Sequence, residues 1–276
     1  MLRRLWQNWH RQRLVEWVRN CPASTLSIQR SGFNWTLEPR SCITEDIVTT
    51  AVFEPKTTER VLSLVKPGMT VIDVGANVGY FTLLMARAVT STGRLIAFEP
   101  TEHYRAFCEQ NIIRNGFGNT VELRCEALSD ATAIVPIAIG SASATLHWSS
   151  PEKNPREYEQ IQTRPLDELA AELQLSRLDL IKVDIDGHEP AFLRGATNTI
   201  RRFLPVIVIE FAQHCLYSAG SSALELRNQL HDLGYSLLSE KTMEVFPSEL
   251  SFLMECGNYS LSANAIAVPH QNCQGN

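Results

Sequence analysis

The 276-residue sequence lacks several features that define particular classes of protein. It contains no run of about eighteen apolar residues, so we expect no transmembrane helix. Its arginine-containing N-terminus has no uninterrupted apolar stretch, which argues against a secretory signal. It shows no internal repeat and no low-complexity segment. An apolar content of 44% and a charged content of 20% are ordinary for a globular protein.

The sequence also lacks a net positive charge and a closely spaced pair of cysteines. The net charge of -5 and the pI near 5.8 argue against a dedicated nucleic-acid binder, which usually carries a basic face. The seven cysteines are scattered, odd in number and include no Cys-x-x-Cys pair. This pattern favours reduced thiols in a cytoplasmic protein over a disulfide framework or a zinc site.

A strand, a glycine turn and a helix follow one another between residues 70 and 88. The run Val-Ile-Asp-Val at residues 71–74 predicts a strand that is buried on both faces of a parallel sheet. Two glycines bracket the turn, and residues 80–88 then predict a helix. This order opens a nucleotide-binding βαβ unit. The candidate cofactor-binding residues of the turn are Gly75, Ala76, Asn77, Gly79 and Tyr80.

Asp73, near the end of the first strand, favours S-adenosylmethionine over a dinucleotide. A carboxylate would repel a pyrophosphate at this helix N-terminus, whereas S-adenosylmethionine carries an ammonium and a sulfonium and no phosphate. Asn77 also stands where a dinucleotide motif has its middle glycine. Glu99 follows the strand predicted at residues 94–98 and is placed to accept hydrogen bonds from ribose hydroxyls, a role that NAD and S-adenosylmethionine sites share.

Two further positions are candidates for the same crevice. The residues after the strand predicted at 121–125 face it, so Ala127 and its neighbours are candidates to hold the adenine. Glu54 precedes the helix predicted at residues 57–65. It either places a negative charge at that N-terminus or reaches the cofactor.

The N-terminal residues 1–50 are predicted to form an extension, and residues 51–276 the main domain. Residues 1–19 predict an amphipathic helix in which tryptophans alternate with arginines, and residues 25–37 predict a β-hairpin. Residues 1–20 either pack on this domain, form a homodimer or lie on a membrane surface. The remaining predicted elements are a hairpin at 134–139 and 144–148, a short strand and a helix within 161–173, strands at 178–183, 205–211, 235–238 and 263–268, and helices at 101–115, 190–201 and 221–233.

Four carboxylates end successive major strands, namely Asp73, Glu99, Asp184 and Glu210. Ligands of open parallel sheets bind beyond the carboxyl ends of the strands. Burying these groups would cost several kcal/mol unless a cation or a hydrogen-bond donor meets them. Because Asp73 and Glu99 face the predicted cofactor, Asp184 and Glu210 remain for the acceptor.

Three motifs resemble the FkbM family of S-adenosylmethionine-dependent methyltransferases. They are Ile-Asp-Val-Gly-Ala-Asn-Val-Gly-Tyr-Phe-Thr at 72–82, Ala-Phe-Glu-Pro at 97–100, which adds Pro100 to the cofactor candidates, and Asp-Leu-Ile-Lys-Val-Asp-Ile-Asp-Gly-His-Glu at 179–189. The resemblance implies an α/β class I methyltransferase fold, a seven-stranded sheet with helices on both faces and one antiparallel strand. It also implies methyl transfer to an oxygen of a small metabolite, sugar or polyketide-like acceptor. Asp186 departs from the family's frequent longer acidic residue, which could change the acceptor.

Methyl transfer to a hydroxyl needs alignment and removal of a proton, and two routes fit the sequence. His188 or Asp184 acts as the general base, with His214 as an alternative. Otherwise Asp184 and Glu210 hold a divalent cation such as Mg²⁺, by analogy with catechol O-methyltransferases. Glu189 is a candidate catalytic residue or a first-turn helix charge.

The acceptor itself is not predicted beyond a small molecule or a carbohydrate. We expect its specificity in residues 140–160, the N-terminal hairpin and the segment after Glu210. A nucleic-acid methyltransferase is the first alternative, but residues 184–187 read Asp-Ile-Asp-Gly, without the Asp-Pro-Pro-aromatic motif or a nucleophilic cysteine. A non-catalytic binding module on the same fold is the second alternative.

Overall fold

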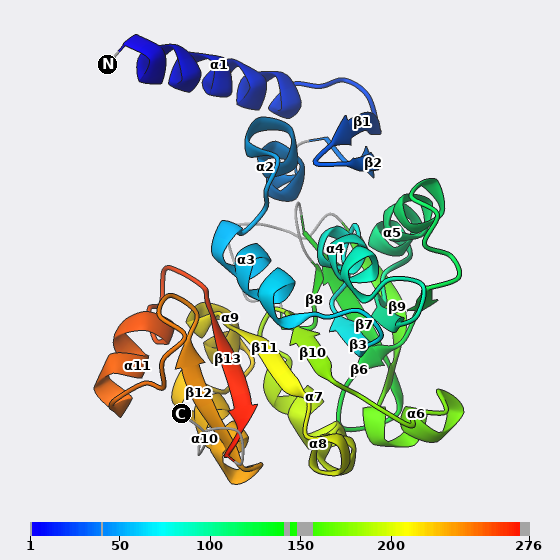
Figure 1. Ribbon diagram of the computed structural model, residues 1–276, viewed down its shortest axis with the longest axis vertical. Coiled ribbons are helices and arrows are strands. Elements are labelled where there is room, and N and C mark those ends of the chain that lie inside the picture. Colours follow the sequence, from blue (N-terminus) through cyan, green and yellow to red (C-terminus); the bar gives the residue numbers. More distant parts are fainter. Residues whose placement is uncertain (1, 40, 141–143, 148–156, 271–276) are drawn as a thin grey trace.

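A seven-stranded sheet with strand order β12-β13-β11-β10-β3-β4-β5 forms the centre of the protein (Figure 1). The structure is a computed structural model that describes residues 2–39, 41–140, 144–147 and 157–270. Strand β13 is antiparallel to both of its neighbours, and the other pairings are parallel. The strands are β3 (Thr70–Val74), β4 (Arg94–Phe98), β5 (Val121–Arg124), β10 (Leu180–Val183), β11 (Val206–Phe211), β12 (Tyr235–Ser239) and β13 (Ala263–Pro269).

Helices cover both faces of this sheet because successive side chains of its strands point to opposite sides. Ile72 and Val74 join one buried cluster, and Val71 joins the other. One face carries α6 (Leu166–Glu172), α7 (Glu189–Gly195), α8 (Thr197–Phe203), α10 (Ala223–Asp232) and α11 (Glu249–Cys256). The other carries α2 (Cys42–Thr50), α3 (Pro55–Leu64), α4 (Tyr80–Val89) and α5 (Glu102–Arg114).

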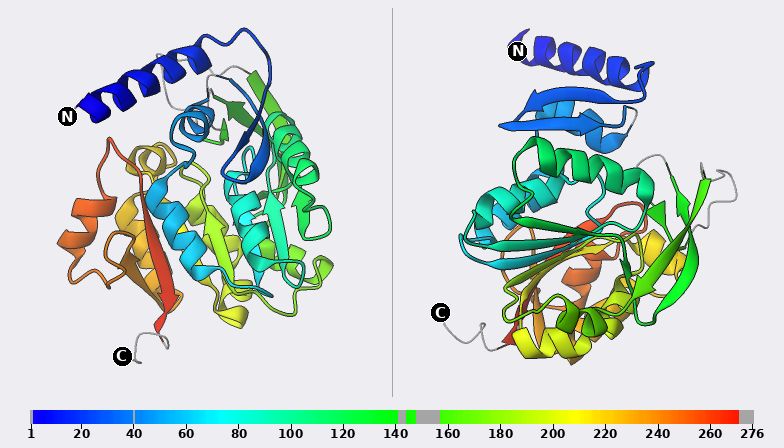
Figure 2. Two further views of the ribbon diagram at one scale, coloured as in Figure 1. Left: turned by 45° about the horizontal axis from the view of Figure 1, so that its top comes forward. Right: turned by 90° about the vertical axis from the view of Figure 1, so that its right-hand side faces the viewer.

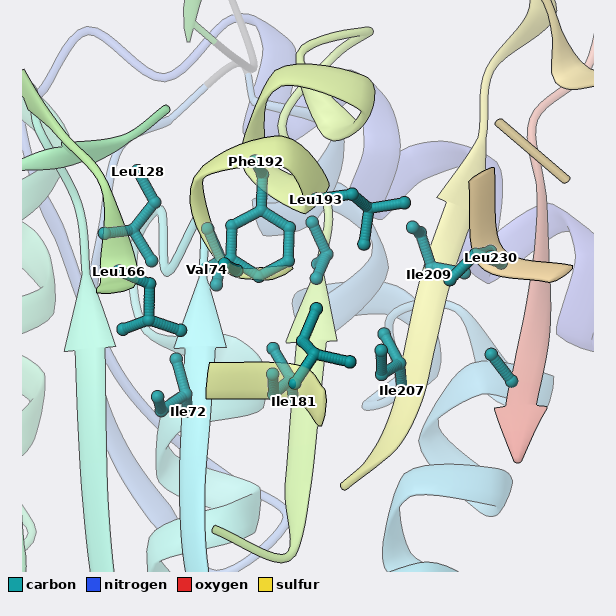
Figure 3. Close-up of a cluster of buried hydrophobic side chains, with 14 of the residues drawn as sticks. Ile72, Val74, Leu128, Leu166, Ile181, Phe192, Leu193, Ile207, Ile209 and Leu230 are labelled. Carbon is teal, nitrogen blue, oxygen red and sulfur yellow. The ribbon is translucent and has the colours of Figure 1, made fainter. Parts of the chain in front are cut away.

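The cluster under α7 fixes that helix against the middle of the sheet. Figure 3 shows the ring of Phe192 beside Val74, above β3 and β10, with Leu193 turned toward β11. The side chains of Phe192 and Leu193 are each at most 1% exposed. Burying an aromatic or leucine side chain contributes about 1.5–3 kcal/mol, so the loop that precedes α7 is anchored firmly.

The helix predicted at residues 190–201 is two helices, and this expectation was wrong. Helix α7 ends at Gly195 and α8 begins at Thr197. A Cβ at residue 195 would lie 1.8 Å from the carbonyl oxygen of Ser129, so the chain must pass this point with a glycine. Helices α2, α9 (Gln213–Ser218) and α11 were not predicted. Each has ten residues or fewer, which is too short for a clear apolar period.

A second sheet with order β6-β9-β7-β8 lies beside the carboxyl ends of the main sheet. It is formed by β6 (Ala127–Leu128), β7 (Ala133–Ile139), β8 (Ala144–Thr145) and β9 (Glu157–Arg164). The predicted hairpin is confirmed as the β7–β8 pair. The pairing of β9 with both β6 and β7 was not predicted. Within the segment expected to carry specificity, residues 141–143 and 148–156 lie outside the described residues.

The N-terminal helix and hairpin are confirmed as α1 (Leu2–Arg19), β1 (Leu26–Arg30) and β2 (Phe33–Leu37). Helix α1 lies at one end of the molecule, next to α2 (Figures 1 and 2). Trp35 and its neighbours on β2 are buried in the same cluster as α4 and α5. Among the described residues, no helix is long and apolar enough to cross a membrane. None of the six described cysteines forms a disulfide.

Asn111 of α5 and Asn115, the C-cap residue of that helix, attach the edge of the hairpin to the main domain. The Asn111 amide accepts a hydrogen bond from Thr36 N at 2.6 Å and donates to Thr36 O at 2.9 Å and to Val78 O at 2.8 Å. One helical turn later, Asn115 makes the same pair of bonds with the backbone of Asn34, at 2.8 Å each. Residues i and i+4 of a helix therefore pair with alternate residues of a strand.

Asn111→Ala should lower the free energy of unfolding by about 3 kcal/mol, because it leaves the buried N–H and C=O groups of Thr36 unpaired. Asn115→Ala is the matched control, since its partner Asn34 is exposed and can bond to water. We expect a loss of about 0.5–1 kcal/mol there. Urea unfolding of both variants measures the difference, and equal losses would contradict a buried amide that secures the hairpin.

Candidate active site

A pocket of about 270 Å³ lies at the carboxyl ends of β3, β4 and β10. The turn after β3, the residues after β4 and the loop after β10 form its walls. Most of the residues predicted to form the site line it. These are Glu54, Gly75, Ala76, Asn77, Tyr80, Glu99, Pro100, Ala127, Asp184, His188 and Glu210. Three of the four strand-end carboxylates, Glu99, Asp184 and Glu210, thus meet in one pocket although they lie up to 111 positions apart.

Gly75 lets the turn after β3 approach the loop after β10. Its φ is +87°, and a Cβ at this position would lie 2.0 Å from the carbonyl oxygen of Asp184. The backbones are joined there, since Asp184 N donates to Val74 O at 3.1 Å. Any other residue would therefore push apart the two loops that form the pocket.

Glu99 holds the turn after β3 in place through hydrogen bonds to its side chain. Its Oε2 accepts a hydrogen bond from Asn77 N at 2.8 Å, and its Oε1 accepts bonds from the Thr101 N–H and hydroxyl at 3.0 and 2.7 Å. Burial raises the pKa of this carboxyl. A carboxylate oxygen has two lone pairs, so Oε2 keeps acceptor capacity for a ligand hydroxyl.

Glu54 is both the N-cap residue of α3 and part of the pocket. Its backbone carbonyl accepts the N–H of Thr58 at 2.9 Å, but its side chain makes no capping hydrogen bond. Its φ of 42° is unfavourable for a non-glycine residue. The strained backbone turns the carboxyl toward the pocket, where burial and then the charge of Asp184 raise its pKa to about 7.

Lys182 is the important residue that sequence reasoning missed. Its side chain is buried within β10, with Nζ 2.9 Å from Asp184 Oδ2 and 4.4 Å from the ring centroid of Phe81. Burial opposes its charge, but the carboxylates of Asp184, Asp73 and Glu54 raise its pKa. A lysine inside an apolar strand, two residues before a strand-end carboxylate, was the available signal.

The pair Asp184 and Glu210, considered as a cation site, lies beside the ammonium of Lys182. Burial opposes the ionisation of Asp184, yet the Lys182 ammonium holds its pKa below the usual value. Burial and the Asp184 charge raise the pKa of Glu210, whose side chain hydrogen-bonds to Asp184. The adjacent ammonium would repel Mg²⁺, and the described part of the chain contains no group of three or more candidate metal ligands. These residues therefore do not fit a divalent cation.

Two predicted cofactor residues do not line the pocket. Asp73 points toward α4, where its Oδ2 accepts the Thr82 hydroxyl at 2.6 Å, and it is only 1% exposed. It lies one residue before the end of β3, so the pleat turns it away from the rim. Gly79 begins α4 with a φ of +90°, and a Cβ there would lie 3.0 Å from Cys108 Sγ. It allows α4 to approach α5.

Glu189, predicted as catalytic, also lies outside the pocket lining. It is fully buried at the first turn of α7, and its Oε1 accepts the N–H of Ile185 at 3.0 Å, which closes the loop after β10. Gly187 in this loop has a φ of +95°, and a Cβ there would lie 2.5 Å from Cys215 O. Asp186, the departure from the family pattern, lines the pocket with a φ of 51°.

His188 lines the pocket and takes part in a hydrogen-bonded chain. Its Nε2 lies 2.9 Å from Ser129 Oγ, and its Nδ1 lies 3.0 Å from His147 Nε2, with the two rings stacked. Burial and then the charge of His147 lower the pKa of His188 to about 4, so it is neutral at pH 7. His147 was not predicted because it lies 41 residues away. His214 is exposed and outside the pocket lining.

The sheet order with one antiparallel strand, together with an acidic pocket at the carboxyl ends of its parallel strands, defines a class I methyltransferase fold. A comparison with known families matches the methyltransferase FkbM domain over residues 73–237, which is 165 of the 276 residues. The chain belongs to the FkbM family of S-adenosylmethionine-dependent methyltransferases. No curated protein matches this chain.

Several solved structures are similar in fold. The FkbM methyltransferase from Methylobacillus flagellatus is 16% identical, with 81% of this chain and 52% of that chain covered and a TM-score of 0.47. This chain thus spans about half the length of that protein. An S-adenosylmethionine-dependent O-methyltransferase from Thermotoga maritima is 13% identical, with coverages of 88% and 77% and a TM-score of 0.46. An O-methyltransferase from Bacillus cereus in complex with S-adenosylhomocysteine is 17% identical, with coverages of 79% and 82% and a TM-score of 0.46.

Glu189→Gln should flatten the pH dependence of stability. Burial raises the pKa of Glu189 from 4.5 to about 8, so between these values the folded protein keeps a proton that the unfolded chain has released. Wild-type stability therefore falls as the pH rises through this range. The variant keeps an acceptor for Ile185 N and cannot titrate. It should lose less unfolding free energy than wild type between about pH 5 and 8, by on the order of 3 kcal/mol.

Urea unfolding at both pH values measures this difference. Glu109→Gln, at an exposed position of α5, is the control and should keep the wild-type slope. If Glu189→Gln also keeps that slope, the Glu189 carboxyl is not the buried titrating group described above.

Proposed function

We propose that this protein transfers the methyl group of S-adenosylmethionine to a hydroxyl oxygen of a small-molecule or carbohydrate acceptor. The observation that carries the proposal is the acidity of the pocket in a chain of this family. Its lining includes six carboxyl groups and one buried ammonium, that of Lys182. The acidic residues are Glu54, Glu99, Glu126, Asp184, Asp186 and Glu210. Such a lining favours a cationic ligand and disfavours a pyrophosphate.

The pocket offers separate groups for each part of the ligand. Glu99 Oε2 is placed to accept ribose hydroxyls, and the backbone from Gly75 to Asn77 lies beside it. Ala127 provides an apolar contact for the adenine. Glu54 and the Asp184–Glu210 pair provide negative charge for an ammonium, and Glu210 Oε2 is buried with no hydrogen-bond partner among the described residues. When bound, S-adenosylmethionine supplies a methyl group on a positively charged sulfur, which is activated for transfer.

His188 is our candidate for the general base. It is neutral at pH 7 and therefore able to accept a proton. Its pKa is low, but an alcohol proton becomes strongly acidic as the oxygen forms a new bond, so a weak base in the right position is sufficient. Asp184 suits this role less well, because its pKa is lowered and Lys182 already pairs with it. We propose that Lys182 holds the acidic residues in place and that no divalent cation is required.

Titration calorimetry with S-adenosylmethionine tests the cofactor assignment. Wild-type protein should bind, and Glu99→Gln should bind about 10- to 100-fold more weakly, because a charged hydrogen-bond acceptor contributes about 1.5–3 kcal/mol. Glu102→Gln is the control, since this carboxyl is exposed at the start of α5, outside the pocket. It should bind like wild type.

Absence of binding by folded wild-type protein would contradict the proposal. In the presence of a hydroxylated acceptor, transfer of labelled methyl should survive the removal of divalent cations with EDTA. Activity that EDTA abolishes and Mg²⁺ restores would overturn the role given to Lys182.

We also propose that α1 lies on an anionic membrane surface. The N-terminal nineteen residues contain five arginines and one acidic residue, Glu16. Leu14 is 38% and Trp17 is 51% exposed, while Val18 is buried in the direction of α2. An exposed tryptophan and leucine on an arginine-rich helix match the interface of a membrane that carries negative lipids.

Co-sedimentation with vesicles tests this proposal. The protein should bind vesicles that contain phosphatidylserine more strongly than vesicles of phosphatidylcholine alone, and Trp17→Glu should reduce that binding at least about fivefold. Ile134→Glu, at another exposed apolar position, is the control and should bind normally. A wild-type dimer that Trp17→Glu converts to a monomer would show instead that α1 is a subunit interface.

A further inference from the structure

A second cavity, of about 540 Å³, adjoins the pocket on the far side of His188. It is a groove between α7 and α10, two helices that pack against each other. From α10 it is lined by Glu225, Asn228, Gln229 and Asp232, which share one helix face because they are three or four residues apart. Apart from Gly187 and His188 of the motif at 179–189, neither the sequence motifs nor the cofactor assignment uses a residue of this groove.

His188 lines both cavities, so it stands at their junction. Its ring partner His147 lines the groove, and the Arg194–Asp130 ion pair, at 2.6 Å, forms the adjacent wall. The pocket of about 270 Å³ is slightly smaller than the range of about 300–1,000 Å³ for small-molecule sites, so a nucleoside-sized ligand would leave little of it free. An acceptor therefore needs other space that still reaches His188, and the groove provides it.

The groove wall indicates the chemical class of the acceptor. Three carboxylates face one guanidinium, Arg194, which is already paired with Asp130, so a phosphorylated or otherwise anionic ligand is disfavoured. Among the described residues that line the groove, the apolar side chains are those of Pro190, Ala191 and Ala219, so a hydrophobic acceptor gains little there. Amide and carboxylate groups in such number suit a ligand with many neutral hydroxyls. The Gln229 Oε1 atom has no hydrogen-bond partner within the described residues.

Two exposed tyrosines contact each other, and one of them is close in sequence to a residue that lines the groove. Tyr217 is 67% and Tyr259 is 58% exposed, their ring centroids are 6.1 Å apart, and Tyr217 stands two residues before Ala219 of the groove. Exposed aromatic rings with polar tips are typical of binding surfaces.

We propose that the groove between α7 and α10 binds a neutral saccharide chain and presents its terminal hydroxyl to His188. This inference rests on the proposed methyl transfer. In the reaction the methyl–sulfur bond breaks and leaves its electron pair on sulfur, as S-adenosylhomocysteine, while a methyl–oxygen bond forms. The hydroxyl proton passes to Nε2 of His188, where the acceptor hydroxyl replaces Ser129 Oγ, and Nδ1 keeps its hydrogen bond to His147. The groove then sets the acceptor, while the pocket sets the methyl donor.

The test uses the full chain saturated with S-adenosylhomocysteine on an array of neutral oligosaccharides. Asn228→Trp places a large side chain in the groove from an exposed position of α10. It should weaken binding to the glycans that the wild-type protein binds by at least about tenfold. Its affinity for S-adenosylhomocysteine should change by less than about twofold. His231→Trp, exposed on the same helix but outside the groove lining, is the matched control and should bind like wild type.

The outcomes separate the two proposals. Protein that binds S-adenosylhomocysteine but none of the neutral glycans, or that binds them equally well as Asn228→Trp, overturns the groove assignment alone. Preferential binding to sulfated or phosphorylated glycans overturns the neutral class. Folded protein that binds no S-adenosylhomocysteine overturns the proposed function itself.

Discussion

The ion pair between Lys182 and Asp184 is the interaction on which the site depends. It places the Lys182 ammonium in the lining of a pocket that is otherwise strongly acidic. A buried pair adds little net stability, but removal of one partner leaves an uncompensated charge at a cost of about 3–5 kcal/mol. Lys182 therefore holds the pKa of Asp184 below its usual value, while burial and the Asp184 charge raise the pKa of Glu210 beside it. The carboxyl groups of the pocket therefore repel one another less than six ionised carboxylates would.

Close approach of backbones completes this arrangement. Gly75 lets the turn after β3 meet the carbonyl of Asp184, and Gly187 lets the next loop meet Cys215. Glu189 then closes that loop from inside by accepting the N–H of Ile185. These contacts hold together the loops that carry the carboxylates. His188 lies on the loop after β10, between the pocket and the groove. Positioning of this kind is how a methyltransferase aligns its reactants.

Much of the proposed cofactor pocket could be predicted from the sequence because its pattern is local. The run at residues 70–88 places an apolar strand, two glycines and a helix in direct succession, and Glu99 follows at the next strand end. Asp73 was predicted to face the cofactor, but it lies one residue before the end of β3. The alternation of side chains along the strand turns it toward Thr82 instead. Glu189 was misassigned because its role depends on a backbone N–H that the folded loop presents to it.

The sequence by itself determined the fold class and the strand-end residues, since apolar period, glycine spacing and the order of motifs are all readable along the chain. Only the tertiary structure decided which charges are paired and which cavities meet. Lys182 contacts Phe81 across the sheet face, and His147 reaches His188 over 41 residues. Such contacts depend on packing between elements distant in sequence, and burial then sets the ionisation state of each group.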